Sequence, residues 1–165
     1  MNSVRWYALS LYLPTDFPKE HNWLVMGPWH GCDKRHLGEA SRHPVMAFRY
    51  DSGRFYLTLR HSTERIILDD DAPAQINLFE TESYPLGQWN DFVVQAKWTC
   101  ESDGFVNAWW NGKQAVQYRG PVGYNDNVGP YFEFGLYRGQ TDRTYVAYYN
   151  QVRSGTSPED IGFKP

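Results

Sequence analysis

The chain has 165 residues, of which 41% are hydrophobic, 17% aromatic and 21% charged. This length and apolar content allow one domain, residues 1–165, to bury a core without metal or disulfide staples. The aromatic content excludes intrinsic disorder, and no apolar run approaches the roughly 18 residues of a membrane span. With 16 Lys and Arg against 19 Asp and Glu, the net charge of −3 favours neither a nucleic-acid nor a membrane partner.

The two cysteines and the N-terminus bear on the cellular compartment. Cys32 and Cys100 do not have the spacing of metal ligands, and two cysteines are too few to define a disulfide framework. They either pair with each other or remain as two buried thiols. The first residues lack the basic stretch and apolar segment of a secretion signal, so we expect that a leader was removed or never existed.

Alternation with a period of two dominates the sequence, as in half-buried β-strands, and it becomes clearer from Trp89 onward. Residues 6–13 are the first predicted strand, which places one apolar set on a single face: Tyr7, Leu9, Leu11 and Leu13. A short apolar run at 23–26 is followed by Trp29 and His30, and then by a hydrophilic surface excursion over residues 32–43.

Turn residues divide the rest of the chain into further strands. Residues 45–50 and 54–61 flank the turn sequence 51–53 and predict a hairpin, and residues 66–68 predict a strand fragment. The later predicted strands are residues 92–99, 105–110, 113–118, 131–138 and 145–153. Asn111 and Gly112 predict a tight turn with positive φ at both positions, and residues 156–160 predict only a short helical turn.

This pattern of many short strands separated by Gly, Pro, Asn and Asp predicts an all-β fold. The expected architecture is a β-sandwich or a jelly roll, which has a concave sheet face. No internal repeat and no low-complexity linker interrupts it.

The segment 131–138 is the most informative for function. As a strand it sends Phe132, Phe134 and Leu136 into the core and places Tyr131, Glu133, Gly135 and Tyr137 on the other face. A glycine inside a strand allows a ligand to approach the backbone closely. The alternative is a tyrosine-rich exterior sheet with a bulge at the glycine.

Five parts of the sequence form a recognisable series in chain order: Arg5 to Pro14, Trp29-His30-Gly31, Trp89 to Val94, Asp103 to Val106 with Trp109 to Gly112, and Tyr131 to Arg138. Together they resemble successive blocks of the polysaccharide lyases of the heparin lyase I-like and glucuronan lyase-like superfamily. The resemblance implies a concanavalin A-like β-jelly roll, a sandwich of two antiparallel sheets with a concave substrate cleft, that cleaves an anionic, uronic acid-containing polysaccharide by β-elimination. It also implies an extracellular or periplasmic location, and no cofactor.

The resemblance assigns roles to individual residues. Tyr137 resembles the family's proton-transfer tyrosine, and His30 resembles the active-site histidine that acts as base or holds the substrate carboxylate. A loop histidine that only packs beside Trp29 is the alternative for His30. The substrate-binding residues expected on this basis are Tyr131, Glu133, Arg60, Trp29, Trp109 and Arg138.

The sequence departs from the family pattern at three points. Pro28 stands where the family has a glutamine, and Glu133 stands where it has a lysine. An upstream Arg-x-Glu strand is expected but lacking. Neutralisation of the substrate carboxylate would then fall to other residues such as Arg49, Arg60, Gln95 or Lys97, or the domain binds sugar without cleaving it.

Other candidate sites carry open alternatives. Arg60 is either a carboxylate clamp or a solvated arginine, and one of Trp109 and Trp110 is expected to anchor the core while the other stacks on sugar. Asp69 to Asp71 could hold calcium, although an acidic turn is usually only solvated; no other metal site is expected. The predicted function is a lyase, with a non-catalytic carbohydrate-binding module or a structural sugar-recognising protein as alternatives.

Overall fold

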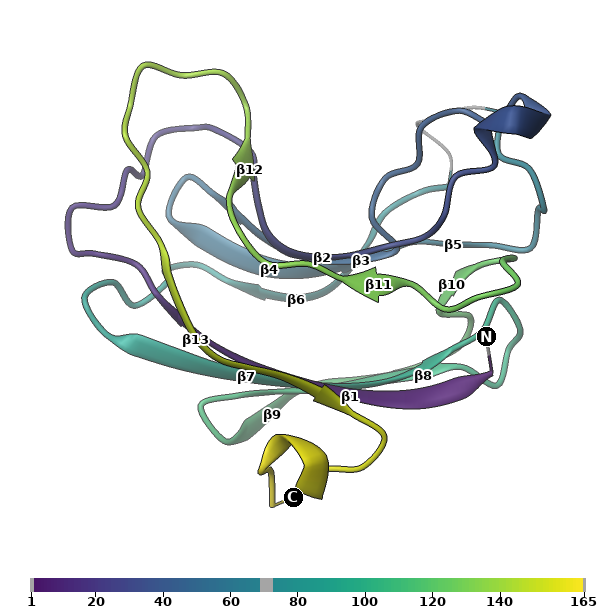
Figure 1. Cartoon of the computed structure of the whole chain (residues 1–165). Helices are drawn as coiled ribbons and strands as arrows, with labels where there is room; N and C mark the ends of the chain where they lie inside the picture. Colours follow the sequence, from purple (N-terminus) through teal and green to yellow (C-terminus); the bar gives the residue numbers. More distant parts are fainter. Residues whose placement is uncertain (1, 69–72, 165) are drawn as a thin grey trace.

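The computed structural model describes residues 2–68 and 73–164 and consists of two stacked β-sheets (Figure 1). One sheet has the strand order β13-β1-β7-β8-β9. Its strands are β1 (Ser3–Tyr12), β7 (Trp89–Trp98), β8 (Phe105–Trp110), β9 (Lys113–Arg119) and β13 (Tyr148–Gly155). All neighbouring pairs in this sheet are antiparallel.

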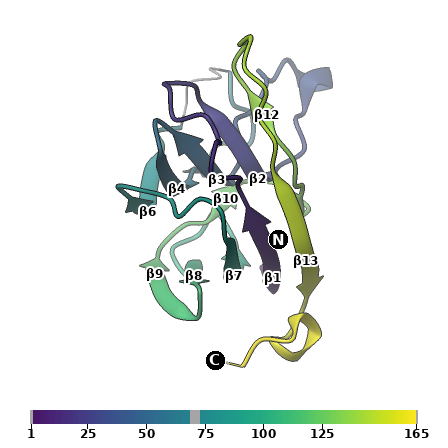
Figure 2. The ribbon, with the colours of Figure 1, turned by 90° about the vertical axis from the view of Figure 1, so that its left-hand side faces the viewer.

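The second sheet has the order β11-β2-β3-β4-β6, and β12 also pairs with β2. Its strands are β2 (Leu24–His30), β3 (Met46–Asp51), β4 (Arg54–Leu59), β6 (Ile76–Thr81), β11 (Tyr131–Phe132) and β12 (Tyr137–Arg138). Viewed from the side, β12 and β13 lie along the same edge of the sandwich, and β6 and β9 lie along the other (Figure 2). The predicted all-β sandwich of antiparallel sheets is confirmed.

Short elements complete the described chain. The strands β5 (His61–Ser62) and β10 (Gly123–Tyr124) pair in parallel. Two single turns of 3₁₀-helix are η1 (Arg35–Leu37) and η2 (Glu159–Ile161), and η2 confirms the helical turn expected near the C-terminus. None of the helices in the described ranges is long and apolar enough to cross a membrane.

The core lies between the sheets and is rich in aromatic rings. Trp29, with 0% of its surface exposed, packs against Tyr7, Phe48, Trp98 and Phe132 at ring-centroid distances of 4.6–6.3 Å. Alternation explains this set, because each strand turns every second side chain toward the facing sheet. The predicted inward face of β1 is confirmed, since its apolar residues are buried: Tyr7, Leu9, Leu11 and, just beyond the strand, Leu13.

The hairpins agree with the sequence prediction. β3 and β4 pair across the turn at Ser52 and Gly53, and both of these residues have positive φ. β8 and β9 pair across Asn111 and Gly112, whose φ values are 48° and 77°. These turns therefore have the left-handed geometry that a tight hairpin connection requires.

Three local predictions were wrong. Residues 66–68 form no strand, because the backbone N–H of Ile67 donates to the Glu39 carboxylate and its carbonyl accepts from Ala40. The segment 131–138 is two short strands separated around Gly135, which has a φ of 144°. Phe134 lies in this interruption and is 55% exposed instead of buried in the core.

The cysteines do not form a disulfide. Cys32 is exposed and Cys100 is half-buried, and both are free thiols. The prediction of two buried thiols is therefore wrong for Cys32, which lies in the polar excursion after β2.

The edge strand β13 is irregular where it pairs with β1. Its pairing with β1 shifts between Ala8 and Ser10, whose partners are Arg153 and Asn150. The extra residue of this bulge is accommodated by Gln151, which has a φ of 52°.

We predict that Trp29→Ala lowers the free energy of unfolding by about 3–5 kcal/mol, because it leaves a cavity among packed rings. Trp23→Ala is the control, since Trp23 is 43% exposed, and should cost less than about 1 kcal/mol. Urea unfolding of both variants measures the difference. Equal losses for the two variants would contradict the central role of Trp29 in the core.

Candidate functional site

The outer face of the β2-β3-β4 sheet lies between two raised loop regions, one after β12 and one around η1 and β5 (Figure 1). One row of residues crosses this face through paired positions: Tyr137 opposite Val25, Val25 opposite Arg49, and Arg49 opposite Tyr56. The next inward-facing positions, such as Phe48 and Leu57, belong to the core. The row therefore presents its polar groups to the concave side of the sheet.

A pocket of about 450 Å³ opens on this face. Its lining residues are Trp23, Val25, Ser41, Arg42, His43, Pro44, Arg49 and Tyr137. We call it the Arg49 pocket. The rings of Trp23 and Tyr137 lie 5.2 Å apart at one end and are 43% and 69% exposed, which makes them an aromatic surface suited to a sugar ring.

Arg49 is half-buried in the floor of the pocket. Its Nε donates to the Thr58 Oγ1 at 3.0 Å, and the Thr58 hydroxyl donates to the Ala47 carbonyl at 3.4 Å. Burial, with a smaller contribution from nearby Arg60, lowers the pKa of Arg49. A guanidinium nevertheless stays protonated inside a protein, so the floor carries a positive charge.

His30 and Tyr131 form a second part of the same face. They are paired residues of β2 and β11, and their rings stack at a centroid distance of 6.0 Å. Burial lowers the pKa of His30 below its ordinary value of 6.5, although the carboxylates of Glu133 and Asp33 oppose this shift. His30 is therefore a neutral imidazole at pH 7, able to accept a proton.

The structure does not bring His30 and Tyr137 together. Tyr137 pairs with Val25, whereas His30 lies five positions further along β2. At the rise of a strand this is about 16 Å. Antiparallel pairing places the two tyrosines of β11 and β12 at opposite ends of β2. The sequence-based assignment of His30 and Tyr137 to one active site stays a prediction.

The wall opposite Tyr137 is fixed by a buried ionic cluster. The Arg42 guanidinium donates to Asp126 at 2.7 Å and to Glu39 at 2.6 Å, and Lys34 donates to Asp126 at 2.6 Å. The side chains of Arg42 and Glu39 are 1% and 0% exposed. Buried charges of this kind are tolerated only when they are paired and hydrogen-bonded, so the loop has little freedom to move.

His43 lines the Arg49 pocket and was missed by the sequence analysis. It follows Arg42 in the wall, and its backbone carbonyl accepts from the Tyr124 hydroxyl at 3.0 Å. Two residues later, the Val45 N–H donates to the Trp29 carbonyl at 2.8 Å. No local motif marks His43, because its position depends on contacts with residues more than 80 positions away.

Three predicted substrate-binding residues, Trp29, Arg138 and Glu133, do not line the Arg49 pocket. Trp29 is fully buried, so it cannot contact a substrate. The guanidinium of Arg138 lies 5.4 Å from the centre of the Tyr145 ring, and Arg138 adjoins Tyr137 in a strand whose neighbouring side chains point to opposite faces. Glu133 is exposed beside the β2 backbone, where its N–H donates to the Pro28 carbonyl at 2.9 Å.

Trp109 is on the other sheet, where it stacks with Trp6 and contacts Phe163 of the C-terminal segment. Trp110 is the one that packs toward the core, beside Phe92. Of the proposed replacement cations and amides, Gln95 and Lys97 also belong to this second sheet, on β7. These residues are therefore outside the Arg49 pocket.

Arg60 follows β4 and lies close to Arg49. Its guanidinium donates to the Pro73 carbonyl, and its buried Nε has no hydrogen-bond partner in the described structure. Asp69 to Asp71, the possible calcium ligands, lie outside the described residues. Within residues 2–68 and 73–164, no group of three or more His, Cys, Asp or Glu side chains is arranged to hold a metal.

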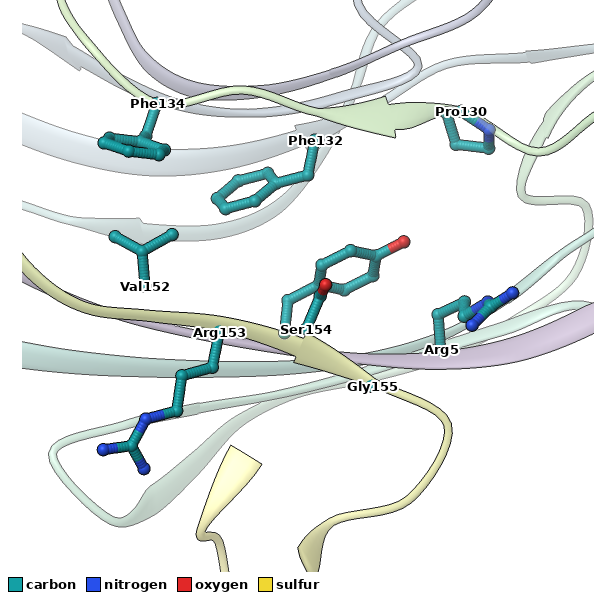
Figure 3. A pocket seen from close by; sticks show the side chains of 9 residues that line it. Arg5, Pro130, Phe132, Phe134, Val152, Arg153, Ser154 and Gly155 are labelled. Atoms are coloured by element: carbon teal, nitrogen blue, oxygen red, sulfur yellow. The ribbon is translucent and has the colours of Figure 1, made fainter. Parts of the chain in front are cut away.

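A second pocket, of about 470 Å³, opens between the sheets at the edge where β11 faces β13 (Figure 3). Phe132 and Phe134 extend toward Val152 and Ser154, while the Arg153 side chain points away from them. This pocket is an opening of the core at the sandwich edge, and it is separate from the concave face.

Comparison with known proteins decides the family. A sequence model described as polysaccharide lyase matches residues 1–153. The chain belongs to the polysaccharide lyase family. A search of the curated proteins found no protein that matches this chain.

Solved structures of similar fold include two lyases. The endo-β-1,4-glucuronan lyase from the fungus Trichoderma reesei has a TM-score of 0.76 and 15% identity, with 96% of this chain and 71% of that one covered. The alginate lyase vAL-1 from a Chlorella virus has a TM-score of 0.62 and 14% identity, with coverage of 95% and 72%. The binding domain of botulinum neurotoxin serotype D has a TM-score of 0.60 and 12% identity, with coverage of 97% and 36%. At these identities the likeness shows the jelly-roll fold.

The ionic cluster makes the stability of this polysaccharide lyase family member depend on pH. Burial by itself would raise the pKa of Glu39, but hydrogen bonds from Arg42, Lys34 and Ile67 hold it below its ordinary value of 4.5. We predict that Glu39→Gln lowers the free energy of unfolding at pH 7 by about 3 kcal/mol. A lowered carboxyl pKa stabilises the fold above the unfolded pKa, so this difference should shrink as the pH falls below 4.5.

Urea unfolding between pH 7 and pH 3 measures this dependence. The control is Glu80→Gln, since Glu80 pairs with Arg54 at 2.8 Å on the exposed surface and should change stability by less than about 1 kcal/mol. A Glu39→Gln variant no less stable than Glu80→Gln at pH 7 would contradict the role of the cluster.

Proposed function

We propose that the protein is a lyase that cleaves an anionic, uronic acid-containing polysaccharide by β-elimination at the Arg49 pocket. The observation that carries this proposal is the presence of the Tyr137 phenol and the Arg49 guanidinium in the lining of one pocket on the concave face. The first group transfers protons and the second neutralises a carboxylate. Membership of the polysaccharide lyase family and the fold shared with glucuronan and alginate lyases support it.

The reaction requires two proton transfers and a tolerated negative charge. A base removes the C5 proton of the uronate, the C4–O4 bond breaks, and the departing O4 takes a proton from an acid. The products are a chain with a C4=C5 double bond and a chain with a free hydroxyl. We assign the acid to Tyr137, whose phenol is exposed in the pocket, and the base to His43, which lines the opposite wall.

His30 and Tyr131 then act on the substrate further along the face. Their stacked rings lie on the same concave side, about 16 Å from the Tyr137 position on β2. A polysaccharide is long enough to occupy both places at once. We propose that this part binds a neighbouring sugar, with the neutral His30 as a hydrogen-bonding partner and Glu133 beside it as a contact for sugar hydroxyls.

A non-catalytic carbohydrate-binding role is the second candidate. The separation of His30 from Tyr137 along β2 favours it, because the two groups predicted to act in catalysis lie toward opposite ends of that strand. A neurotoxin ligand binding domain, 35% of whose chain has a fold similar to this one, is described as a complex with N-acetylneuraminic acid.

We predict that the protein releases unsaturated uronides from glucuronan or alginate, detected by their ultraviolet absorbance. Tyr137→Phe should lower the rate about 100-fold or more while oligosaccharide binding is retained, since only the acidic proton is lost. Tyr148→Phe is the control, because Tyr148 is also an exposed tyrosine but lies on β13 in the other sheet. Binding without absorbance change on any uronate polymer would favour the binding module.

A comparison of the two histidines tests the assignment of the base. We expect His43→Gln to lower kcat about 100-fold, and His30→Gln to change mainly KM, because His30 does not line the Arg49 pocket. Steady-state kinetics on the same polymer separate the two effects. A His43→Gln variant with the parent's kcat would refute the assignment.

A further inference from the structure

We propose that the outer face of the β13-β1-β7-β8-β9 sheet binds a neutral, hydroxyl-rich glycan chain at a site separate from the Arg49 pocket. This face points away from the β2-β3-β4 sheet, so glycan binding there does not depend on the proposed lyase activity. The site has three parts, an aromatic platform, a row of polar side chains and a pocket, which follow one another along strand β1.

Three aromatic residues form the platform. Tyr12 of β1 pairs with Trp89 of β7 on one side and with Tyr148 of β13 on the other. The Tyr12 ring lies 5.5 Å from the Trp89 ring and 5.9 Å from the Tyr148 ring, so all three rings stand on one side of the sheet. Leu11 and Tyr149, their neighbours in sequence, pack toward the core, which places the platform on the outer face. Trp89 and Tyr148 are 47% and 53% exposed, which leaves apolar surface for the C–H face of a sugar ring.

A row of polar side chains lies two residues further along the same strands. Ser10 of β1 pairs with Asp91 of β7 and with Asn150 of β13, and alternation gives this row the outward direction of the platform. The Ser10 hydroxyl donates to Oδ1 of Asp91 at 2.5 Å. Oδ1 of Asn150 accepts from the backbone N–H of Gln151 at 2.8 Å. Within the described part of the chain, Oδ2 of Asp91 and the amide hydrogens of Asn150 have no partner, so both are available to sugar hydroxyls.

A pocket of about 310 Å³ opens next to the polar row on the same face. Its lining shares Asp91 with that row, and it includes Trp109 and Phe163, whose rings lie 5.0 Å apart. Ala8 also lines the pocket and is four positions from Tyr12 on β1, which is about 13 Å at the rise of a strand. A ligand that reaches from the platform to the pocket is therefore an extended chain of sugar residues and not a single sugar.

The C-terminal segment holds one wall of this pocket in place. η2 lies on the outer side of the sheet (Figure 1), and Ile161 within it is 3% exposed. The Arg153 side chain points away from the space between the sheets (Figure 3), and its Nη1 donates to the Ile161 carbonyl at 3.2 Å. Gln151, a further lining residue, has a φ of 52°. This left-handed conformation costs free energy in a residue other than glycine, and such strain is concentrated at binding sites.

The charge on this face favours a neutral glycan over a uronate. Asp91 is exposed and belongs to both the polar row and the pocket, where its carboxylate repels an acidic sugar and accepts strong hydrogen bonds from hydroxyl groups. Arg153 is the one Lys or Arg among the described lining residues, and it is already bonded to the Ile161 carbonyl and the Gln151 side chain. An apolar protein surface docked on the platform would bury the Asp91 carboxylate without a donor, which is costly. Sugar hydroxyls therefore suit this face better.

The test measures binding by calorimetry to two neutral probes, cellohexaose and mannohexaose, and to one acidic probe, a β-1,4-glucuronan hexasaccharide. All proteins carry Tyr137→Phe, so that the acidic probe is not cleaved. We expect the parent to bind at least one neutral probe, and Trp89→Ala to weaken that binding about tenfold or more while the acidic probe stays within about twofold. Trp23→Ala is the matched control, since Trp23 is 43% exposed but lines the Arg49 pocket on the concave face; it should bind the neutral probe like the parent.

Asp91→Asn separates the polar contribution from that of the rings and decides the question if Trp89→Ala does not fold. The amide keeps the size of the side chain but accepts weaker hydrogen bonds, so we expect the neutral probe to bind several-fold more weakly. Tyr148→Phe keeps the third ring of the platform, so it should bind both kinds of probe like the parent.

No binding of either neutral probe by the parent, or unchanged neutral binding by either folded variant, Trp89→Ala or Asp91→Asn, would overturn the proposal. Equal losses of Trp89→Ala on the neutral and acidic probes, or of Trp23→Ala and Trp89→Ala on the neutral probe, would do the same. A dimer in analytical ultracentrifugation that Trp89→Ala dissociates would assign this face to a second copy of the chain instead. Neutral-glycan binding without release of unsaturated uronides by the unsubstituted protein would refute the proposed lyase activity and leave this site standing.

Discussion

The position of the β2 strand is set by the burial of Trp29 among Tyr7, Phe48 and Phe132, and the concave face follows from it. With Trp29 turned inward, alternation turns Pro28 and His30 outward. A bulge between Val25 and Gly27 changes the phase, so that Val25 also faces outward, opposite Arg49. β3, β11 and β12 all pair with β2, so the orientation of β2 sets which residues of these strands face the concave side.

The net charge of −3 does not describe the charge at the concave face, where the proposed anionic substrate would bind. Inside the wall of the pocket, Glu39 and Asp126 pair with Arg42 and Lys34 and form a neutral cluster. The electrostatic field at the concave face therefore depends on which cations remain unpaired there, and not on the net charge of the chain. Burial strengthens this field, since water screens an enclosed guanidinium less than an exposed one.

The sequence predicted the features that depend on local pattern. Strand alternation identified the inward face of β1 and both tight hairpins, but it predicted one continuous strand through Gly135, where the structure has two short ones. Long-range features were not accessible in the same way. His43 enters the pocket through the contacts of Arg42 with Asp126, and His30 is separated from Tyr137 by antiparallel register, which no single segment encodes. The strand β6 was also missed, because its mixed residues do not alternate cleanly.

The bulge at Gln151 has a consequence for how copies of this protein meet one another. β13 and β12 lie along the same side of the sandwich, where Tyr148, Phe134 and Tyr137 expose large rings. A straight edge strand with exposed aromatic rings would pair with strands of other molecules and favour aggregation. The left-handed residue at position 151 and the interruption at Gly135 make the rows of backbone donors and acceptors uneven. An approaching strand finds no continuous register to join, so the aromatic edge is kept from extending the sheet between molecules.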